Sequence, residues 1–147
     1  SKQLGVVVFG KQAEQYASLF PFPIYPMNYV SNEKELVDIY NAVDLYVTPS
    51  LQDNLPNTIV EAMACGIPCV GFNVGGIPQM IDHLHNGYVA EYQSAKDLAN
   101  GIRWTLTEGE YDNLSEEACR KALSSYSESI ISMKYIDIYN KITGSHA

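Results

Sequence analysis

Short apolar runs recur along this chain and predict β-strands. The first is a continuous run of mostly β-branched residues closed by Gly10, which is typical of a strand buried on both faces. A second, shorter extended piece lies among Pro21, Pro23 and Pro26. The predicted strands occupy residues 4–9, 24–25, 44–48, 68–72 and 88–92.

Helix-type patterns fill the intervals between the predicted strands. Asn32 and Glu35 have capping-box spacing ahead of an apolar helical face, and Gly66 ends a helix predicted over residues 58–65. Strands that alternate with helices predict an α/β class: a Rossmann-like parallel sheet with helices on both faces and a C-terminal helical tail. The helices predicted for that last part of the chain open at Ser94, Ser115 and Ser127.

Composition narrows the class of protein. A chain of 147 residues with 46% apolar side chains suits one domain that spans residues 1–147. Nine Lys and Arg against seventeen Asp and Glu give a net charge of −8, which leaves no cationic footprint for nucleic acid. No apolar window reaches the roughly 20 residues of a membrane span, so no transmembrane segment is predicted. Three cysteines argue against a disulfide framework and favour a reducing, cytoplasmic compartment.

The connection at residues 50–61 carries the first candidate site, because ligands of open α/β sheets bind beyond the carboxyl ends of the strands. It places the carboxylates of Asp53 and Glu61 on either side of a helix start. The N–H groups of Asn57 and Thr58 are expected to lie unpaired there, where an anion is favoured. Thr58 and Glu61 also have capping-box spacing, and Asp53 is typical of a turn, so a purely local role stays open for both carboxylates.

A second connection, residues 73–78, contains two adjacent glycines that let backbone approach a ligand closely, although most such pairs are simple turns. The sequence has no Lys or Arg between Lys34 and Lys96, whereas several carboxylates lie there. Because sugar hydroxyls donate hydrogen bonds to carboxylates, this region favours a hydroxyl-rich ligand over a naked phosphate. His83 and His85 have no further ligand pattern around them, so no metal site is predicted.

Ordered motifs follow one another between about residues 25 and 106. They are Y-N-A-V-D-L-Y-V-T-P-S at residues 40–50, the segment 53–61 continued by A-M-A-C-G-I-P-C-V to residue 70, V-G-G-I-P-Q-M-I at 74–81, N-G-Y-V at 86–89 and D-L-A at 97–99. This set resembles the motifs of the family 4 retaining glycosyltransferases of the GT-B fold. The resemblance implies the C-terminal, donor-binding half of a two-domain enzyme.

The resemblance implies a role for each candidate residue. Glu61 would hold the ribose hydroxyls of a nucleotide sugar and Asp53 the hydroxyls of the transferred sugar, and these two are the candidate catalytic residues. They would act by positioning the donor, not as a nucleophile and acid, and no metal or other cofactor is expected. Further contacts are implied for the donor sugar at Asn54 and Leu55, for the diphosphate at Asn57 and Thr58, and for the base at Tyr29 and Val30.

The activity implied is transfer of a glycosyl group, with retention, from a nucleoside diphosphate sugar to a polysaccharide or glycoconjugate acceptor. The chain begins at what resembles the family's second strand. A first strand and helix with basic residues for the diphosphate, and an N-terminal acceptor domain, are therefore expected outside it. The chain alone is expected to be inactive, and the full-length protein to be cytoplasmic or peripheral at the inner face of the membrane.

Two departures from the family pattern keep alternatives open. Asp53 stands where the family usually has Glu, and Pro56 stands where it often has Gly and removes a backbone donor. A degenerate, non-catalytic α/β module is therefore one alternative. Apart from these departures, a nucleotide-sugar epimerase of the same fold and a phospho-acceptor signalling module are two further alternatives.

Overall fold

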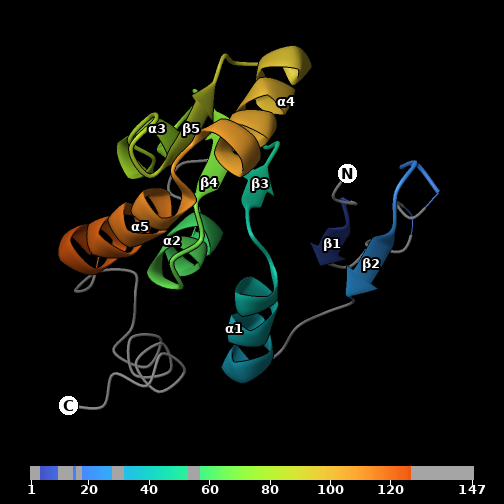
Figure 1. The fold of residues 1–147 in the computed structure, drawn as a ribbon, viewed down its shortest axis with the longest axis horizontal. Helices are drawn as coiled ribbons and strands as arrows, with labels where there is room; N and C mark the ends of the chain where they lie inside the picture. The colour runs from blue at the N-terminus through green and yellow to red at the C-terminus, as the bar shows by residue number, and fades with distance from the viewer. Residues whose placement is uncertain (1–3, 10–14, 16–17, 28–31, 53–56, 127–147) are drawn as a thin grey trace. The chain divides into compact units, whose positions relative to one another are not determined.

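The computed structural model describes residues 4–9, 15, 18–27, 32–52 and 57–126. Contacts divide the chain into two compact units, residues 1–38 and 39–147, and each is described by itself. From α1 to α4 helices alternate with strands along the chain, which confirms the predicted α/β class (Figure 1).

The first unit contains a two-stranded parallel sheet. It consists of β1 (Val6–Phe9) and β2 (Ile24–Met27), with Val6 opposite Ile24. Helix α1 (Glu33–Ala42) begins in this unit, where Asn32 Oδ1 accepts a 2.8 Å hydrogen bond from the N–H of Glu35. The predicted cap at Asn32 is therefore confirmed.

The second unit contains a three-stranded parallel sheet in the order β3-β4-β5. Its strands are β3 (Tyr46–Thr48), β4 (Cys69–Phe72) and β5 (Gly87–Ala90), and Val70 of β4 lies opposite Val47 of β3 and Tyr88 of β5. Among the described residues the strands thus belong to two sheets. Because all three strands of this sheet run the same way, the connections that leave them emerge at one edge.

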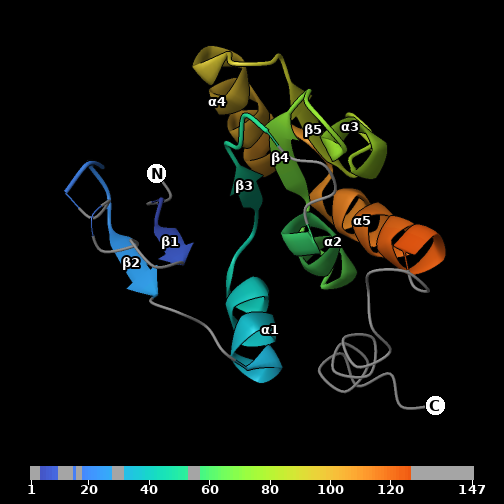
Figure 2. The ribbon, with the colours of Figure 1, turned by 180° about the vertical axis from the view of Figure 1, so that it is seen from behind.

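Helices cover both faces of the β3-β4-β5 sheet (Figures 1 and 2). On one face the ring of Tyr88 packs directly against Gly101 of α4 (Ala95–Arg103), where a Cβ would overlap the ring. On the other face Gly71 approaches Ile77 of α3 (Ile77–Met80), and α2 (Asn57–Ala64) packs against β3 and β4. The predicted arrangement of a parallel sheet between helices is confirmed.

Two helical segments follow α4. The first is a π-helical turn, η2 (Trp104–Glu108), in which the Thr105 hydroxyl donates a 2.8 Å hydrogen bond to the Gly101 carbonyl and Trp104 lies 6.1 Å from the Tyr88 ring. The second is α5 (Tyr111–Tyr126), which packs on α2. The prediction that this helix opens at Ser115 is wrong, because its first turn already closes between the Leu114 N–H and the Glu110 carbonyl.

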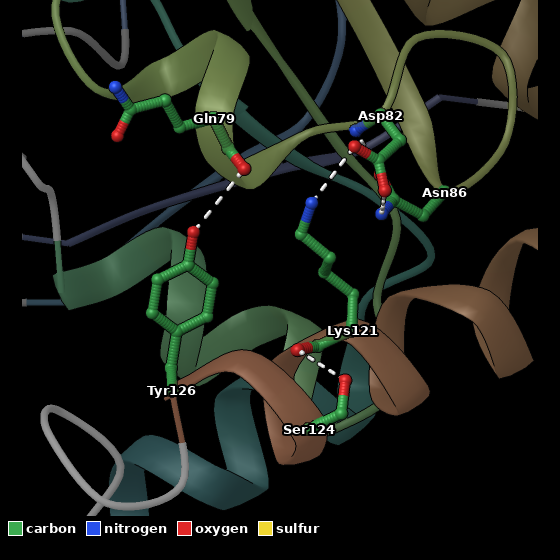
Figure 3. Close-up of polar contacts among 6 residues, drawn as sticks. All are labelled: Gln79, Asp82, Asn86, Lys121, Ser124 and Tyr126. Atoms are coloured by element: carbon green, nitrogen blue, oxygen red, sulfur yellow. Dashed lines mark hydrogen bonds and ion pairs between the residues drawn. The ribbon is translucent and has the colours of Figure 1, made fainter.

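Polar contacts fasten α5 to α3 and to the segment between α3 and β5 (Figure 3). Lys121 Nζ lies 2.9 Å from Asp82 Oδ1, and the Tyr126 hydroxyl donates a 3.3 Å hydrogen bond to the Gln79 carbonyl. The turn itself is held by a 2.9 Å bond from the Asp82 N–H to the side chain of Asn86, which is buried. The helix predicted to open at Ser127 lies outside the described residues.

No helix within the described ranges has the length and apolar character needed to cross a bilayer.

Candidate functional site

The carboxyl edge of the β3-β4-β5 sheet brings the two predicted connections together. The segment after β3 and the segment after β5 are joined by a 3.2 Å hydrogen bond from the Tyr92 hydroxyl to the Leu51 carbonyl. The segment after β4 joins the same edge through a 2.8 Å bond from the Asn73 N–H to the Ala90 carbonyl. Segments far apart in the sequence therefore meet where open parallel sheets bind ligands.

Helix α2 begins at this edge and supplies three of the predicted site residues. Asn57 is its first residue, Thr58 its second, and Glu61 lies one turn further on. The N–H groups of a first helical turn point out along the axis, and the helix dipole favours negative charge there. The start of α2 thus presents backbone donors beside a carboxylate.

Thr58 is held by a neighbouring strand. Its hydroxyl oxygen accepts a 2.9 Å hydrogen bond from the hydroxyl of Tyr46 in β3. Because Thr58 lies inside α2, it does not occupy the position of an N-cap. The capping-box alternative for Thr58 and Glu61 is therefore not the arrangement in the structure.

Glu61 is half-buried and lies against a buried phenol. The hydroxyl of Tyr40, in the last turn of α1, is 3.4 Å from Glu61 Oε2 and 3.4 Å from the Thr58 carbonyl oxygen. Burial raises the pKa of Tyr40 well above its usual range, and the nearby Glu61 carboxylate raises it further. The phenol therefore stays protonated at all ordinary pH values and acts as a hydrogen-bond donor.

The glycine-containing connection forms a tight turn into α3. Gly75 has a φ of +56°, in the left-handed region that favours glycine, and Gly76 follows as the N-cap. The Ile77 N–H then closes the turn onto the Val74 carbonyl at 3.2 Å. A local structural role accounts for these glycines, and their closeness to a ligand stays a prediction.

Several predicted site residues are outside the described part of the chain. These are the sugar-binding and catalytic candidate Asp53, its neighbours Asn54 and Leu55, and the base-binding pair Tyr29 and Val30. Of the predicted set, the structure brings together Asn57, Thr58 and Glu61.

Sequence reasoning missed three tyrosines at this site. The sequence places Tyr40 and Tyr46 in the motif at residues 40–50 and Tyr92 at the end of a predicted strand, but it assigns none of them a contact with the site. Their partners are 18 or 21, 12 and 41 residues away, so periodicity carries no trace of the contacts. A usable signal was present in the first two, because a buried tyrosine normally finds a hydrogen-bond partner for its hydroxyl.

Of the histidines at positions 83 and 85, His83 makes local contacts with its own loop and strand. His83 Nδ1 accepts a 3.0 Å hydrogen bond from the Val89 N–H, and its ring packs edge-on against Tyr88 with centroids 4.6 Å apart. Across the described residues, no group of three or more His, Cys, Asp or Glu side chains is placed to hold a metal ion.

Comparison with known proteins gives this geometry a family. The chain is 29% identical over 117 residues to N,N'-diacetylbacillosaminyl-diphospho-undecaprenol alpha-1,3-N-acetylgalactosaminyltransferase from Campylobacter jejuni, covering 79% of this chain and 31% of that protein. It is 29% identical over 112 residues to N-acetyl-alpha-D-glucosaminyl L-malate synthase from Bacillus anthracis, covering 76% and 29%. The chain thus spans about a third of the length of these relatives.

A solved structure shares the fold. Anabaena Alr3699/HepE in complex with UDP-glucose superposes with a TM-score of 0.70 at 18% identity, over 95% of this chain and 40% of that one. The family Glycosyl transferases group 1 matches residues 27–122, which is most of the chain and includes β3, α2, β4 and β5. The chain therefore belongs to the group 1 glycosyl transferases.

Proposed function

We propose that this chain is the donor-binding domain of a retaining glycosyltransferase that uses a nucleoside diphosphate sugar. The observation that carries the proposal is the position of Glu61, half-buried one turn into α2 at the carboxyl edge of a parallel sheet. A carboxylate beside the amino end of a helix matches a ligand that has hydroxyls next to phosphates. The names of the two relatives, an N-acetylgalactosaminyltransferase and an N-acetyl-alpha-D-glucosaminyl L-malate synthase, support a glycosyltransferase.

The parts of the donor divide over the site according to their chemistry. The ribose hydroxyls donate to Glu61, and the diphosphate oxygens accept from the N–H groups of Asn57 and Thr58. In this proposal the transferred sugar lies toward Asp53, Asn54 and Leu55. The base lies toward Tyr29 and Val30.

The reaction breaks the bond between the anomeric carbon and the diphosphate oxygen and joins that carbon to an acceptor oxygen on the same face, and the proton of the acceptor hydroxyl leaves with the diphosphate. The chain contributes by positioning the donor and by stabilising the negative charge that develops on the departing diphosphate. Asp53 and Glu61 hold hydroxyls in this scheme, and neither is the nucleophile. No metal takes part.

The acceptor side is proposed to come from a further domain of the same protein. The stretch between Lys34 and Lys96 contains no Lys or Arg, so charge compensation for the diphosphate inside this stretch rests on backbone donors. Lys or Arg side chains from outside this stretch would supply the rest of the positive charge that the diphosphate needs. A polysaccharide or glycoconjugate acceptor at a cytoplasmic or peripheral membrane location completes the proposal.

Titration with nucleotides tests the proposal. UDP, GDP, UDP-glucose and GDP-mannose are added separately to the chain, and affinities and backbone amide shifts are measured by NMR. We expect one nucleotide series to bind, with shifts concentrated at residues 57–61 and 73–76. Glu61→Gln should weaken that binding by about tenfold or more, because it removes a charged acceptor from the ribose hydroxyls.

Glu91→Gln is the matched control. It removes the same charge from an exposed side chain in the segment after β5, at the same edge of the sheet. Its effect on affinity should be less than twofold. The proposal is contradicted if no nucleotide binds, or if the two substitutions change affinity equally.

A further inference from the structure

One phenol links α1 to the part of α2 that carries the site. The Tyr40 side chain is only 1% exposed, and its ring packs edge-on against Tyr46 with centroids 6.2 Å apart. Its hydroxyl lies 3.4 Å from both the Thr58 carbonyl oxygen and Glu61 Oε2. A side chain this deeply buried contacts Glu61 from the interior of the protein, not from solvent.

The two acceptors of this phenol share one helix face. Thr58 and Glu61 are three residues apart, and residues at this spacing are neighbours on the surface of a helix. A single donor between the backbone of one turn and the carboxylate of the next restricts the rotation of the Glu61 side chain. The direction of the carboxylate is therefore fixed relative to the backbone of α2.

The surrounding contacts keep the phenol itself in place. The ring of Tyr46 lies against it, and the Tyr46 hydroxyl is bonded to the Thr58 side chain at 2.9 Å. Because the Tyr40 hydroxyl keeps its proton at ordinary pH, its role as donor does not change with pH in the physiological range. The arrangement is a fixed support for one carboxylate oxygen.

We propose that Tyr40 is a positioning residue that sets the direction of the Glu61 carboxylate and so makes the site selective for ribonucleotides over deoxyribonucleotides. The inference rests on the proposed function, in which Glu61 holds the ribose hydroxyls. A carboxylate with a fixed direction binds two adjacent hydroxyls without first losing its own rotational freedom. Removal of the phenol hydroxyl takes away this one restriction on the direction of the carboxylate, so discrimination falls while the other contacts of the nucleotide persist.

The test compares affinities for UDP and for its 2′-deoxy and 3′-deoxy analogues, or for the GDP series if the chain prefers guanine. They are measured by titration calorimetry on the wild-type chain, Tyr40→Phe, Glu61→Gln and the double variant. We expect the wild type to prefer the ribonucleotide. Tyr40→Phe should lower the preference by about fivefold, the size of one modest hydrogen bond. In the Glu61→Gln background the same change should have a smaller effect on the preference, because Gln keeps only one acceptor oxygen.

Tyr111→Phe is the matched control. The Tyr111 hydroxyl donates a 2.7 Å hydrogen bond to the carbonyl of Asp44, which precedes β3 at the opposite edge of the sheet. This substitution removes the same atom and should leave the preference unchanged. Because the preference is a ratio of affinities from one sample, a partly unfolded variant does not alter it.

Each outcome has a distinct meaning. If the wild-type chain binds no nucleotide, the proposed function fails and this inference fails with it. If the wild type discriminates and Tyr40→Phe leaves the ratio unchanged, the inference alone is overturned. It is also overturned if Tyr40→Phe lowers the affinities for all three nucleotides by the same factor, which is the result of a merely structural role.

Discussion

Asp97 shows how one side chain joins a strand end to a helix start. Its carboxylate accepts a 2.7 Å hydrogen bond from the Glu91 N–H, just after β5, and a 2.8 Å bond from the Tyr88 hydroxyl. Its own N–H donates to the Ser94 hydroxyl at 3.0 Å, which confirms the predicted start of this helix. The Glu91 N–H, and after it the Tyr88 hydroxyl, lower the pKa of Asp97 below its ordinary value.

This lowered pKa predicts an acid-sensitive contribution to stability. Because the folded chain holds the Asp97 proton less tightly than the unfolded chain, the contribution is complete above the ordinary pKa of about 3.9 and is lost as the pH falls through the lower folded value. We expect Asp97→Asn to reduce the free energy of unfolding by about 1 kcal/mol at pH 7 and by much less near pH 3. Urea unfolding at pH 7, 5 and 3 measures this difference.

Glu108→Gln serves as the comparison, because it removes an exposed carboxylate that follows α4 in the chain. It should change stability little at any of the three pH values. A loss from Asp97→Asn that stays constant down to pH 3 would contradict the assignment of the effect to the ionised carboxylate.

Among the elements, β4 and β5 approach each other closely at one glycine. A Cβ on Gly87 would overlap the carbonyl oxygen of Cys69 in the neighbouring strand. At Gly71 a Cβ would instead meet two methyl groups, Thr48 Cγ2 at 3.0 Å and Ile77 Cγ2 at 3.1 Å. Backbone held in a sheet cannot move aside, whereas side-chain methyl groups can shift by a few tenths of an ångström.

The difference predicts unequal costs for the same substitution. We expect Gly87→Ala to reduce the free energy of unfolding by about 3 kcal/mol, and Gly71→Ala by about 1 kcal/mol. Urea unfolding of the two variants under one set of conditions gives the comparison. Equal losses, or a larger loss at Gly71, would show that the spacing of β4 and β5 does not set the cost.

The order of the elements was largely readable from the sequence, and their tertiary contacts were not. Short apolar runs located the strands, and the side chains of Asn32 and Ser94 marked two helix starts. The start of α5 was misplaced because Glu110, which precedes it, is not a typical capping residue. The π-helical turn at Trp104–Glu108 also had no signal, since periodicity does not reveal that threonine hydroxyls bond back to the preceding turn.

The sequence also predicts only those parts of the site that depend on local spacing. Asn57, Thr58 and Glu61 lie together because they share the first turns of one helix, which local spacing encodes. Tyr40, Tyr46 and Tyr92 reach the site from other elements. Such contacts depend on how the chain folds back on itself, and a single sequence does not show this.

At the scale of the whole molecule, α5 spans the unit that carries the site. It packs on α2 along its buried face, and Lys121 ties it to Asp82, 39 residues away in the sequence. The Lys121 side chain is 23% exposed and that of Asp82 48% exposed. An ion pair that is partly shielded and joins distant elements contributes more than one in open solvent.

We expect Lys121→Met to lower the free energy of unfolding by about 0.5–1 kcal/mol in low salt, and by less in 1 M NaCl, where charges are screened. Thermal unfolding at both salt concentrations measures the difference. Lys96→Met makes the same chemical change at an exposed position near the start of α4 and should cost nothing. A loss at Lys121 that is independent of salt would assign the effect to packing of the side-chain stem instead of its charge.

The packing of Trp104 against Tyr88 also gives the protein a built-in optical reporter. Trp104 is the sole tryptophan of the sequence, and its ring lies 6.1 Å from that of Tyr88, well within the range of energy transfer between aromatic rings. Its fluorescence reports the junction of α4, η2 and β5, on the sheet face opposite α2. Unfolding of the β3-β4-β5 sheet and its helices can therefore be followed without an added label, by a signal whose source lies on the face opposite α2.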